Sequence, residues 1–109
     1  MTFPKIGNLA PVFALPDQEG TKVKLQDFRD QKNVVVYFYP RDFTSGCTIE
    51  AHGFQEALPA FKKQGAEVIA ISADSVSDHE SFCSSEELKF PLLSDPDGVV
   101  SKAYGSWMA

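Results

Sequence analysis

Two mainly apolar runs, residues 34–39 and residues 67–72, constrain the fold of this chain more than any other feature. Their hydrophobicity is continuous rather than alternating, which indicates strands buried on both faces, as in a parallel sheet. The stretch between them has a helical pattern, and a strand, a helix and a strand in that order form one right-handed βαβ unit. The sequence therefore predicts an α/β domain built around a parallel sheet.

The predicted helix of this unit begins near Ser45 or Gly46 and presents a single apolar stripe. The members of the stripe recur at i, i+4, i+7, i+11 and i+14, and they are Cys47, Ala51, Phe54, Leu58 and Phe61. At 100° per residue these positions stay within about 40° of one line, so Cys47 lies on the buried face at the first turn. Pro59 removes a hydrogen-bond donor inside this pattern, and we therefore expect a kink or a break near residue 58.

Shorter elements flank this unit on both sides. Residues 13–15 and 23–25 form a predicted N-terminal β-hairpin with Gly20 in its turn. Ser77 and Glu80 match a capping box, which predicts that a second, polar and weakly held helix begins there. A third strand over residues 89–94, a turn and a short helix ending near residue 104 complete the pattern.

The composition fits one domain over residues 1–109. The net charge of -5 gives an acidic protein, which argues against nucleic acid or an anionic membrane as partner. No run is apolar enough to span a bilayer, and the first residues lack the apolar core of a signal peptide. We therefore expect a cytoplasmic protein, or one in an organelle after removal of a transit peptide. In a reducing compartment, two cysteines favour redox chemistry or metal binding over a structural disulfide.

The stretch PRDFTSGCTIE, residues 40–50, places Cys47 where thiols become reactive. The unpaired N–H groups and the positive dipole end of a helix N-terminus stabilise a thiolate. Thr44 can donate to the sulfur, Gly46 lets a ligand approach the backbone, and Pro40 can shield the sulfur from water. From the spacing alone, a nucleophilic Cys47 and an ordinary core cysteine are equally acceptable.

The segment YFYPRDFTSGCTIEA resembles the active-site segment of the peroxiredoxins, whose signature Pro-x-x-x-Thr-x-x-Cys is matched by Pro40, Thr44 and Cys47. The stretches CTIEAHGFQEALPAFKKQGAEVIAISAD and KFPLLSDPDGVVSKAYGSW resemble the Q subgroup, and the similarity covers nearly the whole chain. The resemblance implies a thioredoxin-like fold of the peroxiredoxin type with an N-terminal hairpin. It also implies a thiol-dependent peroxidase that reduces hydrogen peroxide and organic hydroperoxides without metal, haem or flavin.

The same resemblance implies catalytic roles for four residues. Cys47 would be the peroxidatic cysteine and become a sulfenic acid, Thr44 would orient thiolate and peroxide, and Pro40 would shield them. Many members of the subgroup carry the resolving cysteine five residues later, where this chain has His52. Others carry it in the next helix, so the resemblance assigns Cys83 as the resolving residue. Local unwinding would join the two thiols in an intramolecular disulfide, which a thioredoxin-like protein would reduce.

The chain also departs from the family. The resemblance implies two further strands and a helix after residue 109, and one of those strands carries an activating arginine that neither Arg29 nor Arg41 replaces. Without these strands we expect an unpaired apolar edge along residues 34–39, which invites aggregation or strand exchange. The resemblance implies a monomer, but a partner chain or an exchanged strand would cover this edge. The alternative function is a weak or inactive thioredoxin-fold fragment that acts as a redox or interaction module.

Two other kinds of site fit the sequence less well. Cys47, His52, His79 and Cys83 are residue types of a zinc site, but the first two lie about 140° apart around a helix. A dithiol oxidoreductase would need Cys-x-x-Cys, and its first cysteine is replaced here by threonine. We therefore expect both histidines to lie on the surface and the acidic Asp95 to belong to a solvated turn.

Overall fold

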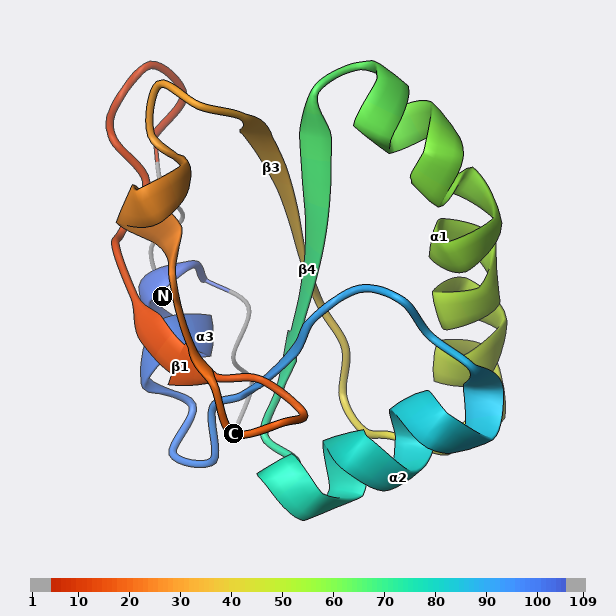
Figure 1. Ribbon diagram of the computed structural model, residues 1–109. Helices are drawn as coiled ribbons and strands as arrows, with labels where there is room; N and C mark the ends of the chain where they lie inside the picture. The colour runs from red at the N-terminus through yellow and green to blue at the C-terminus, as the bar shows by residue number, and fades with distance from the viewer. Residues whose placement is uncertain (1–4, 106–109) are drawn as a thin grey trace.

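A parallel three-stranded sheet forms the centre of the molecule (Figure 1). The computed structural model describes residues 5–105. The strands β3 (Asn33–Phe38), β4 (Ala66–Ser72) and β5 (Leu92–Ser94) lie in the order β3-β4-β5. Six residue pairs join β3 to β4 and three join β4 to β5, all in parallel register. The predicted parallel α/β sheet is therefore confirmed.

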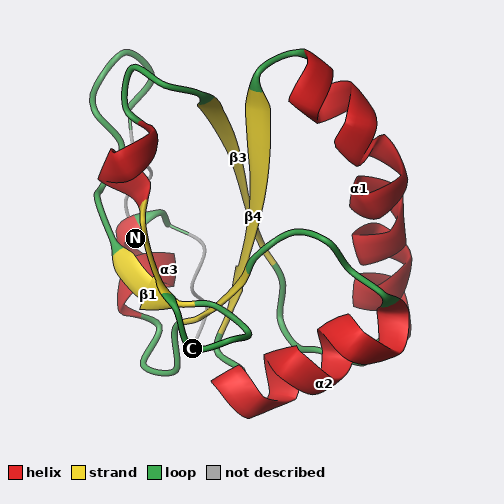
Figure 2. Ribbon diagram, in the orientation of Figure 1, coloured by secondary structure: helices red, strands yellow, loops and turns green. Residues whose placement is uncertain are grey.

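Helices and an N-terminal hairpin cover the two faces of this sheet. Helix α1 (Ser45–Lys63) connects β3 to β4, and α2 (Val76–Glu86) connects β4 to β5. Figure 2 shows α1 and α2 on one side of the sheet, with the N-terminal segment and α3 (Val99–Ala103) on the other. The layers are therefore helices, sheet, and a mixed layer of hairpin and short helix.

The side chains of β4 divide the core into two parts. Val68 and Ala70 pack in the cluster under α1 and α2, whereas Ile69 and Ile71 pack in the cluster under the hairpin and α3. All four are fully buried. Because successive strand side chains point to opposite faces, one continuous apolar strand fills both parts of the core.

The predicted hairpin is present, with each strand shifted by one residue. Strand β1 (Ala14–Pro16) pairs antiparallel with β2 (Lys22–Lys24), and Gly20 adopts the positive φ that its turn requires. A short 3₁₀ helix, η1 (Leu25–Phe28), follows β2 and was not predicted.

Pro59 lies inside α1, and the helix continues past it to Lys63, so a break, one of the two outcomes predicted near residue 58, is wrong. A proline in a helix interior costs about 3 kcal/mol. The apolar stripe offsets this cost, because Ala51 and Leu58 are buried against the core and Phe54 and Phe61 pack at its margin.

Helix α2 begins two residues earlier than the sequence pattern indicated. Its N-cap is Ser75, whose side-chain oxygen accepts a hydrogen bond from the backbone N–H of Asp78 at 3.1 Å. The predicted capping box of Ser77 and Glu80 is therefore wrong, because both residues lie within the helix. The helix ends at Glu87, which adopts the left-handed conformation.

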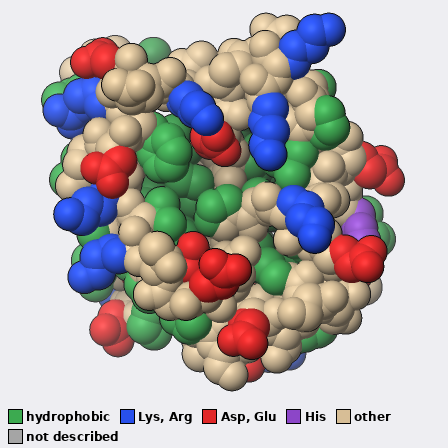
Figure 3. Space-filling view, viewed as in Figure 1, with side chains coloured by type: hydrophobic (Ala, Val, Ile, Leu, Met, Phe, Trp, Pro, Cys, Tyr) green, Lys and Arg blue, Asp and Glu red, His purple; other side chains and the backbone are tan. Residues whose placement is uncertain are grey.

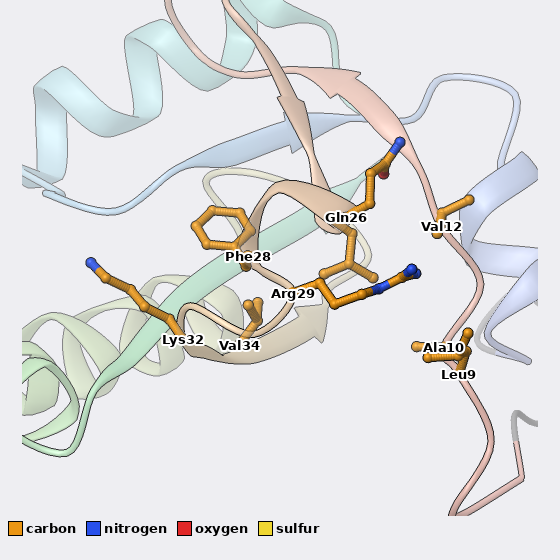
Figure 4. Close-up of a pocket in the computed structure, with 9 residues that line it drawn as sticks. Leu9, Ala10, Val12, Gln26, Phe28, Arg29, Lys32 and Val34 are labelled. Atoms are coloured by element: carbon orange, nitrogen blue, oxygen red, sulfur yellow. The ribbon is translucent and has the colours of Figure 1, made fainter.

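Within residues 5–105, β3 pairs with β4 alone, so no strand lies along its other edge there. An apolar hollow of about 170 Å³ lies near the start of β3, and Figure 4 shows Leu9, Ala10 and Val12 on one side of it. Hydrophobic side chains also gather in a depression on the face shown in Figure 3, with lysine and arginine side chains around it. None of the described helices is both long and apolar enough to cross a membrane.

Candidate active site

The loop between β3 and α1 places Cys47 at the start of a helix, as predicted. Thr44 is the N-cap of α1, and its carbonyl accepts hydrogen bonds from the backbone N–H and the hydroxyl of Thr48, at 2.9 and 2.8 Å. Cys47 is the third residue of the helix and is half-buried. Its thiol therefore lies in the first turn, where backbone N–H groups have no partner within the helix.

Thr44 and Pro40 lie in the loop between β3 and α1, as the sequence predicts. The Thr44 hydroxyl donates to the carbonyl of Arg41 at 3.1 Å. Pro40 is exposed. Arg41 is also exposed. The catalytic roles of Thr44 and Pro40 stay predictions.

The two thiols belong to one apolar cluster, although their positions are 36 residues apart in the chain. Cys83 lies within the cluster beneath α1 and α2, and Cys47 packs against it. Both cysteines are free thiols. The pKa of Tyr37 is raised, first by burial and then by the charges that Glu50, Cys47 and Cys83 carry when ionised. Tyr37 packs against the same cluster as Cys47, between the helices that carry the two cysteines and the sheet.

Burial raises the pKa of the Cys83 thiol from 9.0 to about 12, and the carboxylates of Asp42 and Asp17 add to this rise. Cys83 is therefore protonated and a poor nucleophile in the folded, reduced protein near neutral pH. A hollow lined by Cys83, Glu80 and Glu87 opens beside it.

Alkaline pH is expected to destabilise the protein. The unfolded chain releases the Cys83 proton near pH 9.0, whereas the folded chain keeps it to about pH 12. Between these values the unfolded state binds fewer protons, so the free energy of unfolding falls as pH rises. Burial raises the pKa of Tyr39 as well, and the hydrogen bond it donates to Asp42 adds to this rise. Urea unfolding at a series of pH values should show a free energy of unfolding that falls steadily above pH 9. The Cys83→Ala variant should lose less of this free energy over the same pH range. A wild-type free energy that does not change with pH would contradict the raised pKa of Cys83.

A buried polar network lies behind the candidate site. His79 Nδ1 lies 2.7 Å from Asp42 Oδ2, and the Tyr39 hydroxyl donates to Asp42 Oδ1 at 2.5 Å. His79 Nε2 lies 3.1 Å from the carbonyl oxygen of Leu93. The exposed fractions of His79 and Asp42 are 0% and 5%. The expectation that His79 lies on the surface is therefore wrong.

The network was missed because a histidine among polar residues is usually solvated. The signal that could have found it is helical spacing. Phe82 and Cys83 stand three and four residues after His79, so the three share one face of α2, and the structure buries all of them.

The network also includes Asp74, which stands just after β4. Its carboxylate accepts from the Ser72 hydroxyl at 2.6 Å and from the backbone N–H of Asp42 at 2.9 Å. Asp42, Asp74 and His79 form the group of described side chains close enough together to hold a metal ion. Their ligand atoms are already engaged in the hydrogen bonds of the network, so the cluster is accounted for without one.

Asp95 begins the predicted turn, since its carbonyl accepts from the backbone N–H of Gly98, but its carboxylate is buried. Its carboxylate accepts from the backbone N–H groups of Val100 and Ser101 and from the Ser101 hydroxyl, at 3.3, 2.9 and 3.0 Å. The expectation that this carboxylate is solvated is therefore wrong. It fixes α3 against the end of β5.

His52 lies at the surface, as predicted, and it links the two helices that carry the cysteines. Its Nε2 lies 2.7 Å from Glu86 Oε1 on α2. The hydrogen bond from His52, followed by one from Ser85, lowers the pKa of Glu86. His79 points to Asp42 instead, so the described residues do not gather the two histidines and two cysteines considered for zinc.

A model of the AhpC/TSA family matches residues 6–109. Peroxiredoxin Bcp of Escherichia coli is 45% identical over 103 residues, which are 94% of this chain and 65% of that protein. The chain therefore belongs to the AhpC/TSA family, and the resemblance to the Q-subgroup peroxiredoxins is confirmed. It spans a little less than two thirds of the length of this relative.

Solved structures show the same fold. The peroxidoxin BcpB of Mycobacterium tuberculosis superposes with a TM-score of 0.86 at 36% identity, covering 91% of this chain and 64% of that one. A structure of the Xanthomonas campestris bacterioferritin comigratory protein, studied for alkyl peroxide reduction activity, gives 0.78 at 37% identity over 85% of this chain and 59% of that one. The fold is thioredoxin-like and of the peroxiredoxin type.

Proposed function

We propose that this chain acts as a thiol-dependent peroxidase on hydrogen peroxide and organic hydroperoxides. The observation that carries the proposal is the place of Cys47, in the first turn of α1 and within the Pro-x-x-x-Thr-x-x-Cys segment. The family membership supports it, as does the alkyl peroxide reduction for which the Xanthomonas structure was studied.

In the first step, the Cys47 thiolate attacks one peroxide oxygen. An S–O bond forms as the O–O bond breaks, and the leaving alkoxide or hydroxide takes a proton to become an alcohol or water. Cys47 is oxidised to a sulfenic acid, and the peroxide is reduced. The helix N-terminus favours the thiolate, and in this proposal Thr44 turns its hydroxyl toward the sulfur when peroxide binds.

In the second step, Cys83 attacks the sulfur of Cys47. A disulfide forms, the S–O bond breaks, and the Cys83 proton leaves with the hydroxide as water. Burial keeps Cys83 protonated in the closed structure, so this step needs the end of α2 to open. The open form exposes the thiol to water, which restores its ordinary acidity. The dithiol of a thioredoxin-like protein then reduces the disulfide and is itself oxidised.

The first test is the mass and free-thiol count of the reduced chain after one equivalent of hydrogen peroxide. We expect a monomer that has lost two hydrogens and both thiols, because a Cys47–Cys83 disulfide has formed. A Cys83→Ser variant should instead stop at a sulfenic acid that a dimedone reagent captures. An unchanged mass after minutes would contradict peroxidase activity and favour the inactive redox or interaction module.

The remaining features of the proposal are a thioredoxin-like reductant, a monomer, and a location in the cytoplasm or an organelle. The acidic composition supports a partner other than nucleic acid or an anionic membrane. A peroxide assay coupled to thioredoxin, thioredoxin reductase and reduced nicotinamide cofactor tests the reductant. Loss of turnover when thioredoxin is omitted is the expected result.

A further inference from the structure

We propose that His79 is a positioning residue for Cys47, acting through Asp42 on the loop that leads into α1. The inference rests on the proposed function, because the position it controls is that of the peroxidatic thiol. His79 belongs to α2, and its ring nitrogens face Asp42 and the carbonyl of Leu93. Its ring fixes Asp42, and Asp42 is the anchor of the loop.

Asp42 holds the loop because it is the buried side chain of the segment 40–43. Pro40, Arg41 and Phe43 are exposed, whereas Asp42 is buried. Its carboxylate takes hydrogen bonds from Tyr39 and lies against His79, and its backbone N–H donates to Asp74. Asp42 therefore attaches the loop to the rest of the molecule from its side chain and from its backbone, and the ring of Phe43 adds an edge-on contact with Phe82.

The backbone just beyond Asp42 is strained. Phe43 has φ of 63°, in the left-handed region, and its side chain is 55% exposed. A residue other than glycine adopts this conformation at a cost and keeps it where its surroundings hold it there. The next residue is Thr44, the N-cap of α1. Release of Asp42 would let Phe43 relax, and the cap and the first turn with Cys47 would move with it.

The hydrogen-bond partners of His79 fix the orientation of its ring. Nδ1 faces the Asp42 carboxylate, and Nε2 faces the Leu93 carbonyl, and both of these oxygens only accept. The Tyr39 hydroxyl, 3.2 Å from Nδ1, gives its own proton to Asp42. Ser72, 3.4 Å from Nε2, gives its proton to Asp74. Both ring nitrogens thus face oxygen atoms of fixed residues, which makes the attachment of Asp42 directional.

The two parts of α2, before and after His79, are held by different contacts. The first turn is fixed by the Ser75 cap and by His79, whereas the later part is held by the burial of Phe82 and Cys83. The later part can therefore open for the resolving step while His79 keeps the loop and the first turn of α2 in place.

The decisive experiment compares His79→Gln, Asp42→Asn and the double variant, all in a Cys83→Ser background. His52→Gln is the matched control, because it removes the other histidine, which is exposed. Two quantities are measured on folded protein: the rate of Cys47 oxidation by hydrogen peroxide, and the backbone amide resonances of residues 44–48. Each single variant should lower the rate by between about ten- and a hundredfold and shift these amides, since small misplacements have effects of this size. The double variant, with a neutral amide pair, should recover part of the rate.

An unchanged rate of Cys47 oxidation and unchanged amide resonances of residues 44–48 in folded His79→Gln would overturn the inference. The same would follow if His52→Gln lowered the rate and shifted the resonances as much as His79→Gln does. If these variants do not fold, long-range proton–nitrogen spectra of the wild-type protein decide, because a His79 Nδ1 without a proton contradicts the hydrogen bond to Asp42. Failure of the proposed function looks different. In that case the parent Cys83→Ser protein reacts with peroxide no faster than free cysteine, while the amides of residues 44–48 still shift in His79→Gln.

Discussion

Cys47→Ser is expected to lower peroxide consumption by at least about a thousandfold, the scale seen when an enzyme loses its nucleophile. A serine hydroxyl is not ionised near neutral pH, so it cannot replace the thiolate that attacks the O–O bond. The measurement is the initial rate of peroxide loss with a small-molecule thiol such as dithiothreitol as reductant.

Cys83→Ser is the matched control, since it makes the same change at the second thiol. This variant should keep the first oxidation, because Cys47 and its loop are untouched, and dithiothreitol should reduce its sulfenic acid directly. The thioredoxin-coupled rate should fall, since no disulfide forms. The assignment of the two cysteines would be reversed if Cys47→Ser kept its burst of peroxide consumption and Cys83→Ser lost it.

Phe82→Ala is expected to lower the free energy of unfolding by about 3–5 kcal/mol, as for other fully buried phenylalanines. Its side chain is 1% exposed and packs in the cluster that holds Cys83. Phe43 provides the control, because its ring meets that of Phe82 edge-on, with centroids 5.1 Å apart, but is largely exposed. Phe43→Ala should cost no more than about 1.5 kcal/mol, the scale of an aromatic pair.

Urea unfolding followed by circular dichroism measures both changes. Because Phe82 secures the later part of α2, the stability loss should be accompanied by faster formation of the Cys47–Cys83 disulfide in Phe82→Ala. Equal stability losses in the two phenylalanine variants would show that burial at position 82 is not what holds this helix.

The sequence was sufficient to predict the sheet and the place of Cys47, because both depend on hydrophobic periodicity. Continuous apolar runs specify β3 and β4, and the spacing from Cys47 to Phe61 specifies the face of α1 that packs on them. These are local patterns whose three-dimensional meaning follows from strand and helix geometry alone.

Polar burial could not be predicted in the same way. His79 and Asp42 are 37 residues apart, and nothing in the sequence near either residue reveals the other. Asp95 resembled part of a solvated turn, because its role depends on the N-terminus of α3 folding back over it. Such pairings are properties of the folded chain, since each burial is tolerated where its partner is present.

Two predictions from local sequence rules, the helix break at Pro59 and the N-cap of α2, were wrong. The proline rule at residue 59 was outweighed by the packing of Ala51 and Leu58 against the sheet. The capping rule was applied to Ser77, whereas Ser75 has the extended backbone that an N-cap needs. Serine occurs at both positions, so only the backbone conformation distinguishes them.

The alternation of side chains along β4 has a consequence for how such a protein can change over evolution or by design. The two cores share a strand but no side chains, and both thiols belong to the one beneath α1 and α2. Substitutions around Ile69, Ile71 and Phe13, on the opposite face, can therefore tune thermal tolerance without altering the surroundings of the sulfur atoms. Substitutions on the sheet face beneath the hairpin are thus suited to raising thermal stability. Substitutions on the face beneath the two helices are suited to changing the reactivity of the cysteines.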